Sequence, residues 1–248
     1  MIELKTPGQI ARMRKAGAIV GETLALMRRT VRPGVTTQEL DRLAEDYISG
    51  RGAAPAFKGY NGFPATLCTS VNEQVVHGIP GLRKLESGDI ISIDCGAVID
   101  GYFGDAAVTL PVGDVAPEVK GLLEATEAAL YQGISQATRG KRLYDVSHAI
   151  QSYVESRGYS VVRDYVGHGI GRAMHEEPQI PNFGKPGRGP RLEVGMVLAI
   201  EPMINLGTYE VKTLSDHWTV ITKDGRASAH FEHTVAITEN GPEILTRS

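Results

Sequence analysis

The sequence predicts an α/β fold made of two similar helix–helix–strand halves, and three observations carry this prediction. The chain begins with two segments of helical periodicity, each introduced by a capping box. A β-hairpin signal follows. The same order of helices and strands then returns about 106 residues later. At 248 residues, the chain is long enough for one large domain with a substantial core.

The helices are predicted from their caps and apolar spacing. Residues Thr6 to Gln9 form a capping box with Pro at the first helical position, and Pro33-Gly34 ends the helix. A second box begins at Thr36, and that helix ends near Gly52. Two further helices are expected from Pro117 and over 143–156. The apolar positions expected to face the core of the first helix are Ile10, Met13, Gly17, Val20, Leu24 and Met27.

The hairpin is predicted over residues 89–110. Asp100-Gly101 lies between two apolar runs, and this dipeptide favours a type I′ turn. If these two residues form the loop, Asp105 lies opposite Gly96. Asp94 is then on the same face as Asp105, about 7–8 Å away at the backbone. Two carboxylates on one apolar face repel each other and lose hydration, so they need a cation.

An internal repeat relates the two halves, which are expected to cover about 1–110 and 111–248. The segment LESGDIISID (85–94) matches LEVGMVLAIE (192–201), which aligns Asp94 with Glu201. The segment FGDAAV (103–108) resembles FEHTV (231–235), which brings Asp105 near Glu232. Strands are expected over 65–69, 196–204, 217–222 and 229–238. The repeat therefore places four acids at matching positions.

Composition excludes several classes of protein. The net charge of -3 lacks the basic excess of a nucleic-acid-binding protein, so no nucleic acid is expected as a partner. No apolar run reaches the roughly 18 residues of a membrane span. The charged N-terminus lacks the apolar core of a signal peptide. The two cysteines, Cys68 and Cys95, form no CxxC motif, which fits a reducing, cytoplasmic setting.

The four acids and His168 form a candidate metal site. His168 lies in the glycine-rich segment VGHGIG (166–171), which leaves its imidazole uncrowded. Carboxylates with one imidazole suit manganese, iron, cobalt or zinc in a two-metal site, where shared acids hold the ions about 3.5–4 Å apart. Taken singly, each acid could equally belong to a solvated strand face or cap a turn, and His168 could be an ordinary loop histidine. The repeat argues for a common role.

With these residues in this order, the chain resembles the methionine aminopeptidases, M24 metallopeptidases. The motifs that carry the resemblance are VNEQVVHGIP (71–80), GDIISIDCGAVIDGYFGDAAVT (88–109), GHGIGRAMHEEPQIPNF (167–183), GMVLAIEP (195–202) and FEHTV (231–235). The resemblance implies a pita-bread fold, with two pseudo-symmetric halves around a central antiparallel sheet in one catalytic domain, 1–248. The spacing from His175 to Glu201 leaves no room for the type II insertion, so the chain looks like the short bacterial type I form.

The resemblance also implies residue roles. Asp94 would chelate one divalent ion, Asp105 and Glu232 would bridge the pair, and His168 and Glu201 would bind the other. Glu201 would accept a proton from the attacking water. The ions could be cobalt, manganese, iron, zinc or nickel. Asn72 and Ser228 match positions that hold a structural monovalent cation in some members.

The same resemblance implies a substrate site. His77 and His175 would hydrogen-bond the scissile amide and its carbonyl oxygen, although both could instead be structural histidines. His230 and His233 flank a candidate ligand and are interpreted as structural, with a supporting role near the metals as the alternative. Candidate residues for the methionine pocket, whose alternative is ordinary core packing, are Tyr60, Phe63, Cys68, Met174 and Trp218.

The predicted function is removal of the initiator methionine from nascent polypeptides when the second residue is small. An Xaa-Pro dipeptidase or creatinase-like hydrolase is the alternative within this fold, but those proteins usually carry an additional N-terminal domain. A non-catalytic binding protein is the alternative from another class, yet such relatives tend to lose metal ligands and all five are present here. Nascent N-termini are the expected partner, the ribosome is a further candidate, and the chain is expected to be monomeric.

Overall fold

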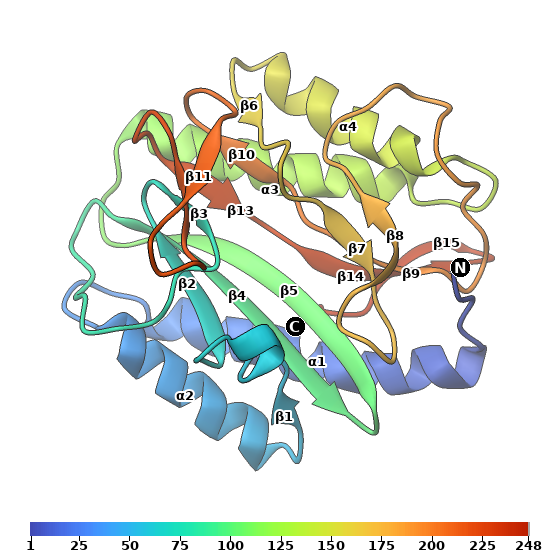
Figure 1. The fold of residues 1–248 in the computed structure, drawn as a ribbon, viewed down its shortest axis with the longest axis horizontal. Helices are drawn as coiled ribbons and strands as arrows, with labels where there is room; N and C mark the ends of the chain where they lie inside the picture. The colour runs from blue at the N-terminus through green and yellow to red at the C-terminus, as the bar shows by residue number, and fades with distance from the viewer. Residues whose placement is uncertain (248) are drawn as a thin grey trace.

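The computed structural model describes residues 1–247 and places four α-helices on two sides of a set of antiparallel strands. Helices α1 (Pro7–Thr30) and α2 (Thr37–Gly50) lie on one side, while α3 (Pro117–Gln136) and α4 (Leu143–Glu155) lie on the other (Figure 1). Both predicted capping boxes are present, at Thr6 and Thr36. The helices thus begin where the capping chemistry predicts.

The longest strands are β4 (Ile90–Ile99) and β5 (Tyr102–Pro111), which form the predicted hairpin. Asp100 and Gly101 have φ angles of 53° and 75°, as a type I′ turn requires at its two central residues. Helix α1 packs against both strands. The other strands of this sheet, which both pair with β4, are β1 (Ala54–Pro55) and β2 (Leu67–Val71).

A five-stranded sheet forms the other large layer, in the order β15-β14-β9-β7-β8. Its strands are β7 (Gly167–Gly169), β8 (Glu176–Ile180), β9 (Val197–Ile200), β14 (His233–Thr238) and β15 (Gly241–Ile244). Two three-stranded sheets lie beside it. They contain β3 (Gln74–Val76), β6 (Ser160–Val161), β10 (Met203–Asn205), β11 (Val211–Thr213), β12 (Val220–Thr222) and β13 (Ser228–His230).

The predicted strands differ from the observed ones mainly where they are interrupted. The run 196–204 is divided into β9 and β10, with Glu201-Pro202 between them. The run 229–238 is divided in the same way around Phe231-Glu232. The first predicted strand lies two residues later, in β2, and only Val220–Thr222 of the run 217–222 is a strand. Antiparallel pairing holds throughout, but the interruptions divide the strands among four sheets.

The main hydrophobic core extends across both sides of the fold. Buried side chains from α1 and α2, the hairpin, α3 and α4, and β9 belong to one cluster. A second cluster lies around Phe57, Phe63, Met174 and Ile170, next to the inner face of the hairpin. Within residues 1–247, no helix is both long and apolar enough to cross a membrane.

Candidate metal centre and substrate pocket

The hairpin positions the first two acids in the predicted register. Asp105 pairs with Gly96, and Asp94 pairs with Ala107 two positions along, so the two carboxylates are diagonal neighbours on one face. Asp105 is 3 % exposed. The turn at Asp100-Gly101 therefore determines the distance between them.

The strand interruptions position the other two acids. Glu201 follows β9 and Glu232 precedes β14, and these strands pair through Ile200 and His233. Glu232 leaves that ladder and pairs with the hairpin instead, because its N–H donates to Ala107 O at 2.9 Å and its carbonyl accepts from Ala107 N at 3.3 Å. Both acids line the same cavity as Asp105, and ligand atoms of Glu232 and Asp105 lie within 4.8 Å of each other.

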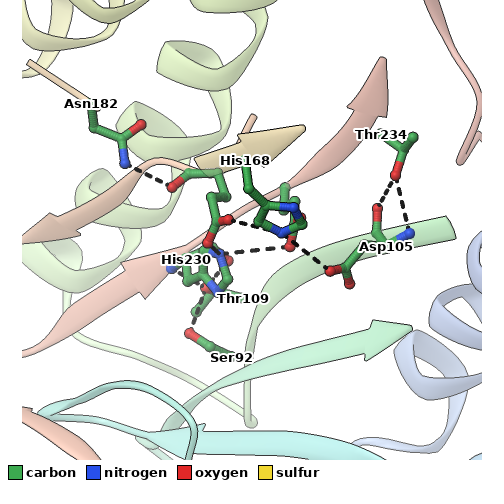
Figure 2. Close-up of polar contacts among 9 residues, drawn as sticks. Ser92, Asp105, Thr109, His168, Asn182, His230 and Thr234 are labelled. Atoms are coloured by element: carbon green, nitrogen blue, oxygen red, sulfur yellow. Dashed lines mark hydrogen bonds and ion pairs between the residues drawn. The ribbon is translucent and has the colours of Figure 1, made fainter. Parts of the chain in front are cut away.

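Two threonine hydroxyls extend this connection between β5 and the C-terminal strands. Asp105 N–H donates to Thr234 Oγ1 at 3.0 Å, and Thr234 Oγ1 donates to Asp105 O at 2.8 Å. Thr109 makes the same double contact with the backbone of His230, at 2.8 Å each way. The pairs 105/234, 107/232 and 109/230 follow an antiparallel register, so side-chain hydroxyls replace backbone partners on either side of Glu232 (Figure 2).

His168 comes from β7, which pairs with β9 at Ala199. Its Nδ1 lies 2.9 Å from Gly169 O and donates to it, because a carbonyl oxygen can only accept. The lone pair of neutral His168 is therefore on Nε2, which faces Asp105 Oδ2 at 3.8 Å and Glu201 Oε1 at 3.6 Å (Figure 2). This is the tautomer that a metal ligand requires.

Burial and mutual repulsion perturb the acids strongly. Burial raises the pKa of Asp94 from 3.8 to about 7. Burial, together with the charges of Asp94 and Glu201, raises the pKa of Asp105 well above its usual value, and burial does the same for the pKa of Glu201. The pKa of Glu232 is raised by burial and by the charges of Asp105, Glu201 and Asp94. Four such carboxyls in one cavity call for positive charge.

The donor set fits divalent ions. Asp94 Oδ1, Asp105 Oδ1 and Glu232 Oε1 are buried without a hydrogen-bond partner in the described chain. Buried polar atoms rarely remain unpaired in folded proteins, and a site for an ion is one recognised cause. Ligand atoms of Asp105, His168 and Glu232 lie within 4.8 Å of one another, as do those of Glu201, His230 and Glu232. The structure thus brings together the five predicted ligands and adds His230 to them.

A cavity of about 190 Å³ opens beside the acids. It contains all the predicted pocket residues together with the candidate ligands. Its lining residues are Phe57, Tyr60, Asn61, Phe63, Cys68, His77, Asp94, Asp105, His168, Met174, His175, Glu201, Trp218 and Glu232. One apolar pocket therefore lies directly against the cluster of acids.

The two other predicted histidines lie in this cavity and are neutral at pH 7. Burial lowers the pKa of His77 to about 4 and lowers that of His175. His175 Nδ1 lies 2.8 Å from the hydroxyl of Tyr60, and its ring lies 4.2 Å from that of His168. His77 has a φ angle of 60° and packs edge-on against Trp218. Neutral imidazoles at these places can each donate one N–H to a ligand.

Sequence reasoning missed Phe57, which forms part of the cavity wall. Phe57 lies in an irregular segment with no periodicity, so nothing in the sequence marked it as part of the wall. His230, interpreted as structural with a supporting role near the metals as the alternative, lies outside the cavity lining, and its ring lies close to Glu201 and Glu232. Ser228 N donates to Asn72 O at 2.9 Å, which places the two candidate residues for a monovalent cation side by side; the cation itself stays a prediction.

Comparison with known proteins agrees with this geometry. The model for metallopeptidase family M24 matches residues 11–239. A methionine aminopeptidase of Clostridium acetobutylicum is 59 % identical over 99 % of both chains. The solved methionine aminopeptidase of Thermotoga maritima superimposes with a TM-score of 0.98 at 49 % identity, covering all of both chains.

A prolidase of Pyrococcus furiosus shares the fold at a TM-score of 0.77 and 24 % identity, but the chain covers only 65 % of its length. At that identity the likeness concerns the fold alone. The predicted pita-bread architecture is confirmed by these neighbours. On the family match and the full-length identity, the chain belongs to metallopeptidase family M24.

Proposed function

We propose that this chain is a methionyl aminopeptidase that removes the initiator methionine from nascent proteins when the second residue is small. One observation carries the proposal. Carboxylate oxygens that are buried without a hydrogen-bond partner lie in the same cavity as an apolar pocket. The relatives from Clostridium acetobutylicum and Thermotoga maritima, which match this chain over nearly their full length, are both named methionine aminopeptidase. The substrate is therefore a peptide whose first side chain is apolar and unbranched.

Two divalent ions are the proposed cofactor. Asp94 would hold one ion, His168 and Glu201 the other, and Asp105 and Glu232 would bridge them. When bound, such ions supply positive charge that polarises the scissile carbonyl and activates water at neutral pH. Oxygen and imidazole donors accept manganese, iron, cobalt, nickel or zinc, and availability in the cell selects among them.

The remaining steps fall to the side chains. Phe63, Met174 and Trp218 surround the methionine side chain and exclude water. Neutral His77 accepts from the scissile amide N–H through its unprotonated ring nitrogen, and neutral His175, oriented by Tyr60, donates to the carbonyl oxygen as negative charge develops there. Glu201 accepts the proton of the attacking water and passes it to the leaving amine.

The setting proposed for this reaction is the cytoplasm. Both cysteines are free and buried, which agrees with a reducing compartment. A monomer acting on nascent chains, close to the ribosome, is the proposed working form.

Two isosteric variants test the activity. Asp94→Asn and Glu201→Gln should each reduce hydrolysis of Met-Ala and Met-Gly peptides by at least about 100-fold while unfolding remains cooperative. Asp100→Asn is the matched control, because it alters an acid of the same hairpin that is exposed at the turn. Retained activity in Asp94→Asn and Glu201→Gln would refute the proposal.

Substrate choice separates the alternatives. Metal-loaded protein that cleaves Xaa-Pro dipeptides faster than Met-Ala peptides would favour a dipeptidase. If dialysed protein bound no divalent ion and cleaved neither substrate, a non-catalytic binding role would replace the aminopeptidase and the dipeptidase proposals.

A further inference from the structure

His230 is the one buried imidazole of this centre to which the proposed reaction gives no role. The residue ends β13 and is 1 % exposed. Its Nε2 has no hydrogen-bond partner within residues 1–247. The atom lies 3.6 Å from Glu201 Oε2 and 3.9 Å from Glu232 Oε2. A buried nitrogen aimed at two carboxylates without bonding either calls for a third participant.

The distances match ligand atoms that share an ion better than they match a hydrogen bond. Hydrogen bonds between nitrogen and oxygen span about 2.7–3.2 Å, so both separations are too long. Two ligand atoms each about 2.1 Å from the same ion lie at most about 4.2 Å apart, and both separations fall within that limit.

His230 is placed much as the predicted ligand His168 is placed. His168 Nε2 lies 3.6 Å from Glu201 Oε1 and 3.8 Å from Asp105 Oδ2. The two oxygens of Glu201 therefore face two different imidazoles, one on each side (Figure 2).

The backbone of His230 is fixed to the hairpin that carries Asp94 and Asp105. Thr109 Oγ1 accepts from His230 N and donates to His230 O, both at 2.8 Å. Because that donation uses the hydroxyl proton of Thr109, Ser92 Oγ, 2.8 Å away, donates to Thr109. Ser92 and Thr109 are a directly opposed pair in the hairpin and both are buried. The imidazole is thus held in place by a rigid element, as ligands of a preorganised site are.

We propose that His230 is a further metal ligand, binding through Nε2 the ion that Glu201 also binds. This inference rests on the proposed dinuclear centre. A second imidazole makes the donor set richer in nitrogen, which favours iron, cobalt, nickel and zinc over manganese and magnesium. His230 consequently contributes to metal selectivity as well as to affinity.

The test compares His230→Gln with His233→Gln. Glutamine retains an N–H donor of similar reach but is a poor ligand for these ions, so it separates ligation from hydrogen bonding. His233 is the matched control, because it adjoins Glu232 on the other side while its Nδ1 pairs with Thr246 Oγ1 at 2.8 Å. Calorimetric titration with Co²⁺ and with Mn²⁺ gives the affinities. X-ray absorption of the Co²⁺-loaded protein gives the number of imidazole nitrogens bound.

His230→Gln is expected to bind one Co²⁺ at least about 10-fold more weakly and to lose one coordinated imidazole, with a smaller loss for Mn²⁺. His233→Gln should keep the imidazole count of the unchanged chain. Unaltered affinities and an unaltered count in His230→Gln would overturn the role of His230 while leaving the dinuclear centre intact. If the protein without any substitution binds no Co²⁺, both the dinuclear centre and the role of His230 are overturned. If His230→Gln does not fold, the count in the unchanged chain decides: two imidazoles support the proposal and a single one refutes it.

Discussion

Uptake of divalent ions should release protons at pH 7, because the four acids of the centre hold protons when no ion is bound. A solvated carboxyl with a pKa near 4 releases fewer than about 0.01 protons at this pH, and an ordinary histidine with a pKa near 6.5 releases about a quarter. Asp94, with its pKa raised to about 7, is half protonated. Metal ligands must be deprotonated to bind, so these protons leave when the ion enters.

The expected release is more than about half a proton per chain at pH 7. Asp94 contributes about half a proton at a pKa of about 7. Asp105, Glu201 and Glu232 supply the remainder, because burial raises the pKa of each well above its usual value. His168 contributes almost nothing, since burial has already lowered its pKa to about 4.

Isothermal titration with Co²⁺ in two buffers of different ionisation enthalpy counts the released protons. Apparent affinity must then rise with pH, because protons compete with the ion for the same carboxylates. The number of protons released on metal binding should decline as pH increases from 6 to 8, because Asp94 ionises over this range even when no metal is bound. A release below about 0.3 protons at pH 7 would show that the carboxyls are ionised without metal, and the burial argument would fail.

The same protons determine how the ion-free chain responds to pH. A carboxyl whose pKa is raised on folding binds more protons in the folded chain than in the unfolded one. Stability is therefore lost as pH rises toward the folded pKa, at up to about 1.4 kcal/mol per pH unit for each proton retained. Histidines with lowered pKa values act in the opposite direction, but only below about pH 6.5, where the unfolded chain protonates them. Protein freed of metal by a chelator should thus unfold more easily at pH 7.5 than at pH 6.5, because Asp94 loses most of its proton in this interval.

Two further substitutions probe the positioning of His175 and His168. Tyr60→Phe removes the hydroxyl that lies 2.8 Å from His175 Nδ1, so kcat on Met-Ala peptides should fall about 3–30-fold while the affinity for Co²⁺ is unchanged; a loss of metal would show that Tyr60 acts elsewhere. Gly167→Ala would place a Cβ 2.4 Å from Ala199 O and force β7 away from β9, so the free energy of unfolding should fall by about 1–3 kcal/mol and metal affinity with it. Gly8→Ala is the control: a Cβ there meets nothing within 4 Å and alanine favours the helix, so its free energy of unfolding should not fall.

The parts of the fold that the sequence predicted are those determined by neighbouring residues. The hairpin register follows from two turn residues and the alternation beside them, so the relation of Asp94 to Asp105 could be worked out before any coordinates. The helix starts follow from capping boxes of four residues. The division of the chain into two repeated halves stays a prediction.

The interruptions at Glu201 and Glu232 could not be predicted in the same way. Residues 196–204 form an almost continuous apolar run, which predicts one buried strand. What ends the ladder at Glu232 is a competing partner, Ala107, more than a hundred residues away. The sequence places His230 two residues before Glu232, but the direction of its side chain toward Glu201 and Glu232 depends on that interruption. Long-range pairing of this kind leaves no local signal.

The contact between strand β5 and the segment 230–234 brings together residues of the metal centre that are distant in the sequence. Along β5, residues 105, 107 and 109 meet residues 234, 232 and 230 in turn. In an antiparallel strand, alternate residues direct their backbone groups to the same edge. Residues 105 and 107 therefore contact the C-terminal segment through backbone N–H and C=O, and residue 109 does so through its hydroxyl. These contacts join the strand that carries Asp105 to the segment that carries Glu232 and His230. The hydroxyl of Thr109 pairs with the backbone of His230, and that of Thr234 pairs with the backbone of Asp105. Neither hydroxyl bonds the carboxylate of Glu232, whose Oε1 has no hydrogen-bond partner within residues 1–247. Some polar groups of the centre thus form hydrogen bonds that stabilise the fold, while others have no partner within the described chain and are available to bind metal.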